Sequence, residues 1–205
     1  MEEREIYILE KAGDLFKKYG IKSVSMDDIA QQLGVSKKTL YSFFCDKAEL
    51  IKKILNQHNC KRDEKFDEVN SQKLNAIDTL LNVSKYLIEM MKDINPVMLY
   101  DLRKYYPELM KELVDDQRGH IFDSIKANIE KGVSEGLYRN DMDAEIISTI
   151  YVARMDDAIF EGKAYSSSFD KEKFFKELFT YHIRGIASAK GIKYYENKIK
   201  NEVLI

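Results

Sequence analysis

The sequence predicts an all-α protein in which three short N-terminal helices form one compact unit and longer helices follow. Chain-breaking residues are scarce, since 205 residues include only 9 Gly and 2 Pro. Apolar residues recur three and four positions apart through most of the chain, which is the spacing of a helix face. No convincing strand pattern, internal repeat or low-complexity tract interrupts them. These observations favour helices throughout.

The first predicted helix covers Glu3–Tyr19, with apolar residues at helical spacing, and Gly20 stands where a C-terminal cap would end it. Ser25 with Asp28 three positions on is typical of a capping box, which opens a second helix that ends at Gly34. Helices this short are not stable alone. We therefore expect the N-terminal helices to share one small core.

Two further capping signals follow. Ser36 is expected to cap a third short helix, and Asp46 with Glu49 repeats the capping pattern and opens a longer helix. The polar segment from Lys61 to Lys73 is interpreted as a helix end and a connection. Beyond it the sequence predicts five helices, in which Pro and Asp suit the starts: Leu74–Lys92, Pro96–Tyr105, Pro107–Gly136, Asp143–Ala164 and Asp170–Lys190.

Composition sets limits on function and location. The chain carries 33 Lys+Arg against 35 Asp+Glu, a net charge of −2, so any contact with nucleic acid must come from a local basic surface. Its two cysteines, Cys45 and Cys60, form no CxxC pair and no disulfide framework. The charged start does not resemble a signal peptide, and no apolar stretch is long enough for a membrane span. We expect a cytoplasmic protein that does not enter a membrane.

The strongest motif is a helix-turn-helix over residues 26–44. Two helices that cross closely need a small residue at the crossing, which Ala30 supplies, and the turn needs a residue that tolerates positive φ, which Gly34 supplies. The apolar residues between the helices fall at the positions needed to fill the wedge: Ile29, Leu33, Val35 and Leu40. Because every requirement is met in register, the motif is specific.

The second helix of such a motif lies in the major groove, with its N-terminal residues facing base edges. The side chains that we expect to contact DNA are Ser25, Ser36, Lys37, Lys38, Thr39, Tyr41 and Lys47. Between residues 34 and 53, five lysines stand against two carboxylates, which gives a local net charge of +3. Surface lysines usually form only a solvated face. That interpretation is preferred for Lys52 and Lys53.

Residues 8–55 resemble the DNA-binding domain of the tetracycline-repressor (TetR/AcrR) family. The residues that carry the resemblance are Ala12, Phe16, Gly20, Ser25, Ile29, Ala30, Leu33-Gly34-Val35-Ser36, Thr39-Leu40-Tyr41, Phe44, Lys47 and Leu50. The resemblance implies a DNA-binding domain at residues 1–50 and a helical ligand-binding and dimerisation domain at 51–205. It also implies a homodimer on a palindromic operator, usually a repressor that a small molecule releases.

One residue departs from the family pattern. Phe43 stands where the family often has a histidine that helps to contact the DNA backbone. A phenyl ring cannot donate a hydrogen bond to phosphate, so Phe43 is expected to pack against the core or against sugar edges. How Phe43 alters the DNA contact stays open, as do the effector, the operator, the regulated genes and the choice between repression and activation.

The C-terminal helices supply candidates for the two roles that the resemblance implies. An apolar stripe in the last helices is interpreted either as a dimer interface or as internal core. The interface candidates are Ile147, Phe175, Leu178, Phe179, His182 and Ile186. Adaptable Met and aromatic side chains favour a small hydrophobic or aromatic effector, although most such residues are simply core. The ligand-binding candidates are Met90, Met98, Tyr100, Arg103, Phe122, Tyr151, Arg154 and Met155.

Two other classes of function fit the sequence less well. Enzymatic activity is not expected, because His58, His120 and His182 lie in no metal or triad signature and no glycine-rich phosphate loop occurs. No cofactor and no metal are expected. A helical interaction or small-molecule-binding protein without specific DNA binding is the alternative. The intact motif from Ser36 to Tyr41 argues against that alternative.

Overall fold

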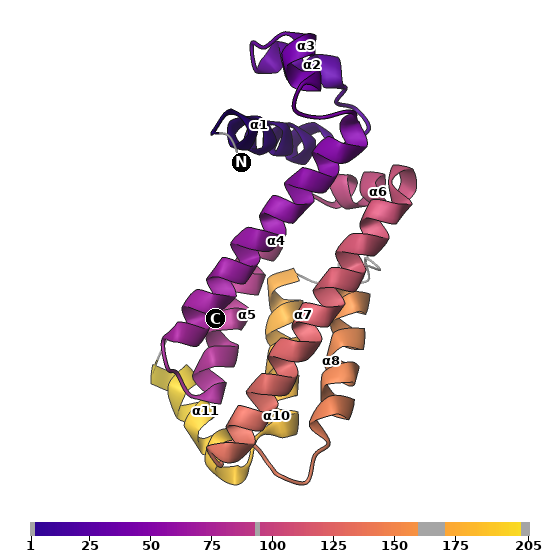
Figure 1. The fold of residues 1–205 in the computed structure, drawn as a ribbon. Coiled ribbons are helices and arrows are strands. Elements are labelled where there is room, and N and C mark those ends of the chain that lie inside the picture. The colour runs from indigo at the N-terminus through magenta and orange to yellow at the C-terminus, as the bar shows by residue number, and fades with distance from the viewer. Residues whose placement is uncertain (1–2, 93–94, 160–170, 202–205) are drawn as a thin grey trace. The chain divides into compact units, whose positions relative to one another are not determined.

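The computed structural model describes residues 3–92, 95–159 and 171–201, and in these ranges the chain is helical apart from turns and one isolated bridge. This confirms the all-α prediction. Figure 1 shows the helices, whose bounds are α1 Glu3–Tyr19, α2 Met26–Gln32, α3 Lys37–Tyr41, α4 Lys47–Ser71, α5 Ala76–Lys92, α6 Pro96–Tyr105, α7 Pro107–Ser134, α8 Ala144–Ile159, α10 Lys171–Ile186 and α11 Ala189–Asn201. Over the described ranges, no helix is both long enough and apolar enough to span a bilayer.

The chain divides into two compact units. The first comprises Met1–Lys65 with Ile94–Leu113, and the second comprises Phe66–Asp93 with Val114–Ile205. The boundary expected at residue 50 falls inside α4. The first unit also takes in α6, which the sequence assigned to the C-terminal domain. No local sequence pattern indicates that α6 belongs to the first unit, because its place there depends on contacts between residues that are distant in sequence.

The core of the first unit lies among α1, α2, α3 and the start of α4. Ile8, Ile29, Leu40 and Leu50 are fully buried there. Each of the short helices α2 and α3 therefore gains its stability from packing, as the sequence predicts. Gly20, which ends α1, has φ of +83°, a conformation that favours glycine.

Helix α4 differs from its expected length. The sequence predicts a helix end and a connection between Lys61 and Lys73, yet α4 continues to Ser71. The segment nevertheless buries Arg62 and Val69, and Arg62 pairs with Asp63 at 2.9 Å. A few buried positions on a largely polar helix are enough to hold it.

The expected helix over Asp170–Lys190 is two helices. Helix α10 ends at Ile186 and α11 begins at Ala189, because backbone groups at the break bond to the turn after α7. The Ser188 amide donates to the Leu137 carbonyl at 2.9 Å, and the Arg139 amide donates to the Ile186 carbonyl at 3.0 Å. The predicted helix Asp143–Ala164 is present as α8 to Ile159, and its remainder, with Asp170, lies outside the described residues.

Helix α11 is held against α5 by a polar cluster. Oδ2 of Asp78 accepts hydrogen bonds from the Tyr194 hydroxyl at 2.6 Å and from the Asn75 amide at 2.9 Å. Lys198 lies 3.4 Å from Oδ1 of the same carboxylate. A carboxylate that is largely removed from water needs such partners. The second unit therefore closes on itself through contacts more than a hundred residues apart in sequence.

Candidate nucleic-acid interface and ligand pocket

Two serine caps build the helix-turn-helix. The Ser25 hydroxyl accepts a hydrogen bond from the Asp28 amide at 3.1 Å, and Asp28 Oδ2 accepts one from the Ser25 amide at 2.8 Å. This is the capping box that the sequence predicts. The Ser36 hydroxyl accepts a hydrogen bond from the Thr39 amide at 3.0 Å. The local sequence therefore fixes where α2 and α3 begin.

The turn between α2 and α3 uses the two small residues identified in the sequence. Gly34 has φ of +63°, and a Cβ placed there would meet no atom within 4 Å. The Val35 amide donates to the Ala30 carbonyl at 3.0 Å, so the chain turns back over the buried Ala30. This arrangement presents α3 at one face of the first unit (Figure 1).

Helix α3 exposes the side chains expected to contact DNA. Lys38 and Tyr41 are exposed, Tyr41 by 49%, and neither makes a side-chain hydrogen bond or ion pair with a described residue. Lys37 is also exposed and pairs with Asp27 at 2.6 Å, which raises the pKa of its ammonium group and keeps it charged. An exposed pair of this kind is weak and can open toward phosphate. Two cations and a phenol are therefore available on one short helix.

The two serines and Thr39 already hold other partners. Besides its capping role, the Ser25 hydroxyl donates to Asp28 Oδ2 at 2.6 Å. The hydroxyls of Ser36 and Thr39 lie 2.8 Å apart in a mutual hydrogen bond. These side chains orient the helix ends, and their contact with DNA stays a prediction. Phe43 is half-buried, with its ring centroid 6.2 Å from that of the buried Phe44.

Lys47 occupies a different environment from the other basic candidates. Its ammonium group donates to the Ile21 carbonyl and lies 5.6 Å from the centroid of the Phe16 ring. Partial burial lowers the pKa of Lys47, against the attraction of Asp101 and Asp28. In this arrangement Lys47 fastens α4 to the segment between α1 and α2. A phosphate contact by Lys47 stays a prediction and would compete with that bond.

Helix α6 packs against the segment that leads into the motif. Asn95 caps α6 through its side chain and donates to the Lys17 carbonyl of α1. The buried carboxylate of Asp101 accepts a hydrogen bond from the Lys22 amide at 2.8 Å. Sequence reasoning missed both residues, because neither stands in a motif. Only the asparagine before Pro96, a helix-start signal, gave any local indication.

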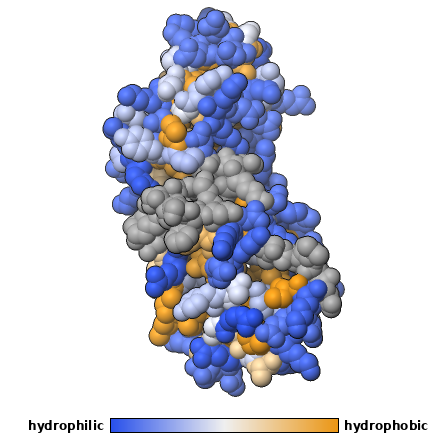
Figure 2. Space-filling view, turned by 180° about the vertical axis from the view of Figure 1, so that it is seen from behind, coloured by the Kyte–Doolittle hydropathy of each residue, from blue (hydrophilic) through white to orange (hydrophobic). Residues whose placement is uncertain are grey.

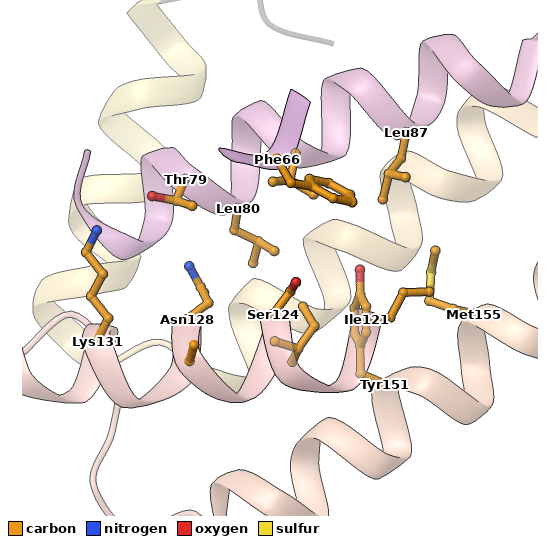
Figure 3. A pocket seen from close by; sticks show the side chains of 13 residues that line it. Phe66, Thr79, Leu80, Leu87, Ile121, Ser124, Asn128, Lys131, Tyr151 and Met155 are labelled. Atoms are coloured by element: carbon orange, nitrogen blue, oxygen red, sulfur yellow. The ribbon is translucent and has the colours of Figure 1, made fainter. Parts of the chain in front are cut away.

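A pocket of about 160 Å³ lies within the second unit, among α5, α7, α8 and the end of α4 (Figure 3). The side chains that line it are Phe66, Thr79, Leu80, Val83, Leu87, Ile121, Ser124, Ile125, Ala127, Asn128, Lys131, Tyr151 and Met155. Eight of these thirteen side chains are apolar. The chemistry of this wall suits a small, largely hydrophobic ligand.

Sequence reasoning identified two of these pocket residues, Tyr151 and Met155. Met98, Tyr100 and Arg103 belong to the first unit, on α6, where Tyr100 is 57% exposed. The remaining candidates are in the second unit without lining this pocket: Met90, Phe122 and Arg154. Residue type alone does not separate core, surface and pocket, so most of the wall was missed.

The apolar stripe of α10 is mainly internal. Phe175, Phe179 and Ile186 are buried within the chain, whereas Ile147 and Leu178 are half-buried. The His182 ring packs on Tyr151, with centroids 4.3 Å apart. The sequence leaves open whether this stripe is a dimer interface or internal core. Burial within the chain assigns Phe175, Phe179 and Ile186 to the internal core. A role for any of the six in dimerisation stays a prediction.

Other apolar residues of the same two helices are exposed. Ile146 and Ile150 of α8 are 58% and 53% exposed, and Tyr181 of α10 is 81% exposed. Figure 2 shows a surface that is mostly hydrophilic, with apolar side chains reaching it in several separate places. Ile146 and Ile150 stand on a helix that the family resemblance assigns to the dimer interface, whereas Tyr181 lies outside the apolar stripe that the sequence predicts.

The comparisons with known proteins agree with this geometry. Residues 8–54 match the family described as bacterial regulatory proteins, tetR family. HTH-type transcriptional regulator YhgD of Bacillus subtilis (strain 168) is 24% identical over 191 residues, which cover 91% of this chain and 98% of that protein.

Two solved structures show the same fold at low identity. A transcriptional regulator from Cytophaga hutchinsonii ATCC 33406 has a TM-score of 0.77 at 16% identity and covers 91% of this chain and all of its own. A transcriptional regulator from Saccharomonospora viridis in complex with choline has a TM-score of 0.70 at 18% identity. The match covers 92% of this chain and 100% of that chain.

A capped helix-turn-helix on an otherwise all-helical chain defines a bacterial DNA-binding transcriptional regulator. The motif and the family match cover the same residues, and a regulator relative aligns over nearly the whole chain. Residues 8–54 therefore form a DNA-binding domain of the tetR family of bacterial regulatory proteins, and the chain is similar to an HTH-type transcriptional regulator over nearly its whole length.

Proposed function

We propose that this regulator is a homodimeric repressor that binds a palindromic operator through α3 and leaves it when a small hydrophobic or aromatic compound binds. The observation that carries the proposal is the exposed row of Lys37, Lys38 and Tyr41 on a helix whose start is fixed by the Ser36 cap. Helices presented in this way place their first residues against base edges.

The proposed dimer supplies the second recognition helix. A two-fold dimer presents the same surface twice, so its operator has two inverted half-sites about 34–36 Å apart. The exposed Ile146, Ile150 and Tyr181 of α8 and α10 are apolar side chains that a second copy would cover. The partly exposed Ile147 and Leu178 extend that surface.

The proposed effector site is the α5–α7–α8 pocket. Its apolar wall supports a hydrophobic ligand, and Tyr151 with Met155 matches the side-chain types expected from the sequence. The structural relative from Saccharomonospora viridis is in complex with choline, a small molecule, which supports effector binding as a property of this chain as well. Binding of effector and of operator must then be linked reciprocally.

The test starts with selection of genomic fragments by the purified protein and measures binding to the selected site over a range of salt concentrations. Lys38→Ala should weaken binding and reduce the salt slope by about one, because one phosphate contact is lost. Tyr41→Phe should weaken binding if the hydroxyl contacts DNA. Lys52→Ala is the matched control, because Lys52 pairs with Glu112 at 2.7 Å outside the motif.

The alternative is a helical small-molecule-binding protein without specific DNA binding. It predicts that no sequence is enriched and that Lys38→Ala and Lys52→Ala change the residual binding alike. An enriched palindrome that distinguishes these two variants excludes it. Repression is tested separately, with a reporter placed behind the selected site in cells that contain or lack the regulator.

A further inference from the structure

We infer that the α5–α7–α8 pocket takes an uncharged, mainly apolar, single-ring compound that places one hydrogen-bonding group against the Tyr151 hydroxyl. This inference rests on the proposed effector role of the pocket and names the chemistry of the effector. Its volume of about 160 Å³ resembles that of dry protein cavities of about 150 Å³ that hold benzene. One ring with a small substituent therefore fits.

Most polar groups of the pocket already have partners within the chain. The Asn128 amide donates to the Ala76 carbonyl at 2.9 Å, and its oxygen accepts a hydrogen bond from the Tyr138 hydroxyl at 3.0 Å. The Thr79 hydroxyl donates to the Asn75 carbonyl at 3.0 Å. A ligand that used these groups would have to break bonds that hold helix ends, so they are poor recognition groups.

Tyr151 is the exception. Its side chain is almost fully buried, with 5% of the residue exposed, and its hydroxyl has no hydrogen-bond partner among the described residues. Figure 3 shows the ring rising from α8 with the hydroxyl directed into the pocket. Burial raises the pKa of Tyr151, so the group stays protonated and can both donate and accept. Ser124 also lines the pocket, but Ser124 is an exposed residue, whereas Tyr151 is buried.

A purely apolar ligand would take the Tyr151 hydroxyl out of water without giving it a partner, a desolvation cost that a ligand with a hydrogen-bonding group avoids. This is why a hydrogen-bonding group on the ligand, and not a purely apolar body, completes the site. The group belongs on the part of the ring that reaches Tyr151. Met155 of α8 also lines the pocket and is 1% exposed. Its methyl group therefore reports whether a ligand occupies the part of the pocket near Tyr151.

The charge of the wall favours a neutral ligand. Among the thirteen lining residues there is no carboxylate to balance a cation. Lys131 is the one lining side chain with a full charge, and its ammonium group donates to the Leu74 carbonyl. An anion would have to draw Lys131 away from that carbonyl. A charge that enters an apolar site without a partner is costly.

Four single-ring probes test the inference on the full-length protein: p-cresol, toluene, 4-methylbenzoate and 4-methylbenzylammonium. The readout is the ¹³C-methyl NMR signal of Met155, assigned with Met155→Leu, from which each dissociation constant is obtained by titration. We expect p-cresol to bind at least about tenfold more tightly than either charged probe. In Tyr151→Phe, the p-cresol-to-toluene affinity ratio should fall by about fivefold, the effect of one hydrogen bond.

Ser124→Ala is the matched control, since it also removes one hydroxyl from the wall, and it should leave that ratio unchanged. Equal or tighter binding of 4-methylbenzoate would overturn the inference of a neutral ligand. An unaltered ratio in Tyr151→Phe would overturn the role of Tyr151. Because these titrations contain no DNA, they give their answer whether or not an operator is found, and failure of the repressor proposal is detected separately by the selection experiment.

Discussion

The Lys22 amide donates a 2.8 Å hydrogen bond to Asp101, so a side chain of α6 fixes the backbone that leads into the helix-turn-helix. The same carboxylate approaches Gly20, where a Cβ would lie 3.0 Å from its Oδ2. Asp101 therefore fits closely over the end of α1 and the segment that follows it. The position of this segment depends on α6 as well as on its own sequence.

Asp101→Ala should destabilise the first unit by about 1–3 kcal/mol, because it removes the acceptor of a part-buried amide. Hydrogen exchange by NMR checks the site directly, since the Lys22 amide should exchange faster while amides in the middle of α7 keep their protection. Arg103→Ala, an exposed change on the same helix, serves as the control. Unchanged exchange at Lys22 would show that the bond contributes nothing to local stability.

Two glycines of α7 should respond in opposite directions to alanine. A Cβ on Gly132 would lie 2.0 Å from the Tyr138 ring, so Gly132→Ala should cost about 1–3 kcal/mol through overpacking. A Cβ on Gly119 meets nothing within 4 Å, so Gly119→Ala should stabilise the helix by up to about 1 kcal/mol. Thermal unfolding followed by circular dichroism measures both. Equal shifts of the two melting temperatures would contradict the close approach at Gly132.

Stability should fall as the pH is lowered through the range set by His182. Burial lowers the pKa of His182 to about 4 from its ordinary 6.5, and its Nε2 has no hydrogen-bond partner among the described residues. The unfolded chain therefore takes up the proton first, and stability is lost as pH falls from 6.5 toward 4. Between pH 7 and pH 5 the loss from this group is about 2 kcal/mol.

Urea unfolding at pH 7 and pH 5 measures that loss, and His182→Gln should reduce it. His58 acts in the same direction, since desolvation of its ring and the charges of Lys17 and Lys61 lower its pKa, so part of the acid sensitivity remains in His182→Gln. His120→Gln is the control, because His120 is exposed. An identical pH dependence in wild type and His182→Gln would argue against a neutral, buried imidazole.

Ile150→Glu should disrupt the proposed dimer. Ile150 is 53% exposed on α8, so the folded monomer should tolerate a carboxylate there, whereas a two-fold interface would bury two unpaired charges. We expect the dimer dissociation constant to rise by about two orders of magnitude or more. Sedimentation velocity over a concentration series measures it. Tyr7→Glu, at a 50% exposed apolar residue of α1, is the matched control, and an unaffected dimer in Ile150→Glu would move the interface elsewhere.

The N-terminal motif was predictable because its signals are local. The caps at Ser25 and Ser36 and the turn at Gly34 each depend on residues within four positions of one another. The residues that determine these structures can therefore be recognised in the sequence. The break between α10 and α11 was not predictable in this way. It depends on the Leu137 carbonyl, and a Cβ on Gly191 would lie 1.9 Å from that oxygen.

The pocket shows the same limit. Tyr151 and Met155 were identified by residue type, whereas Phe66 fell in a segment interpreted as a connection. Asn128 and Lys131 looked like ordinary polar positions of a long helix. Their place in the wall follows from how α4, α5, α7 and α8 pack, which no single periodic pattern contains.

Asn128 also limits how such a regulator can evolve. Its amide joins the start of α5 to the Tyr138 hydroxyl beyond the end of α7, so a change there to suit a new ligand would also loosen the scaffold. Val83 and Ala127 line the same pocket with side chains that make no hydrogen bond. If the pocket holds the effector as proposed, descendants of this protein that respond to different compounds should diverge first at these two apolar positions and retain Asn128.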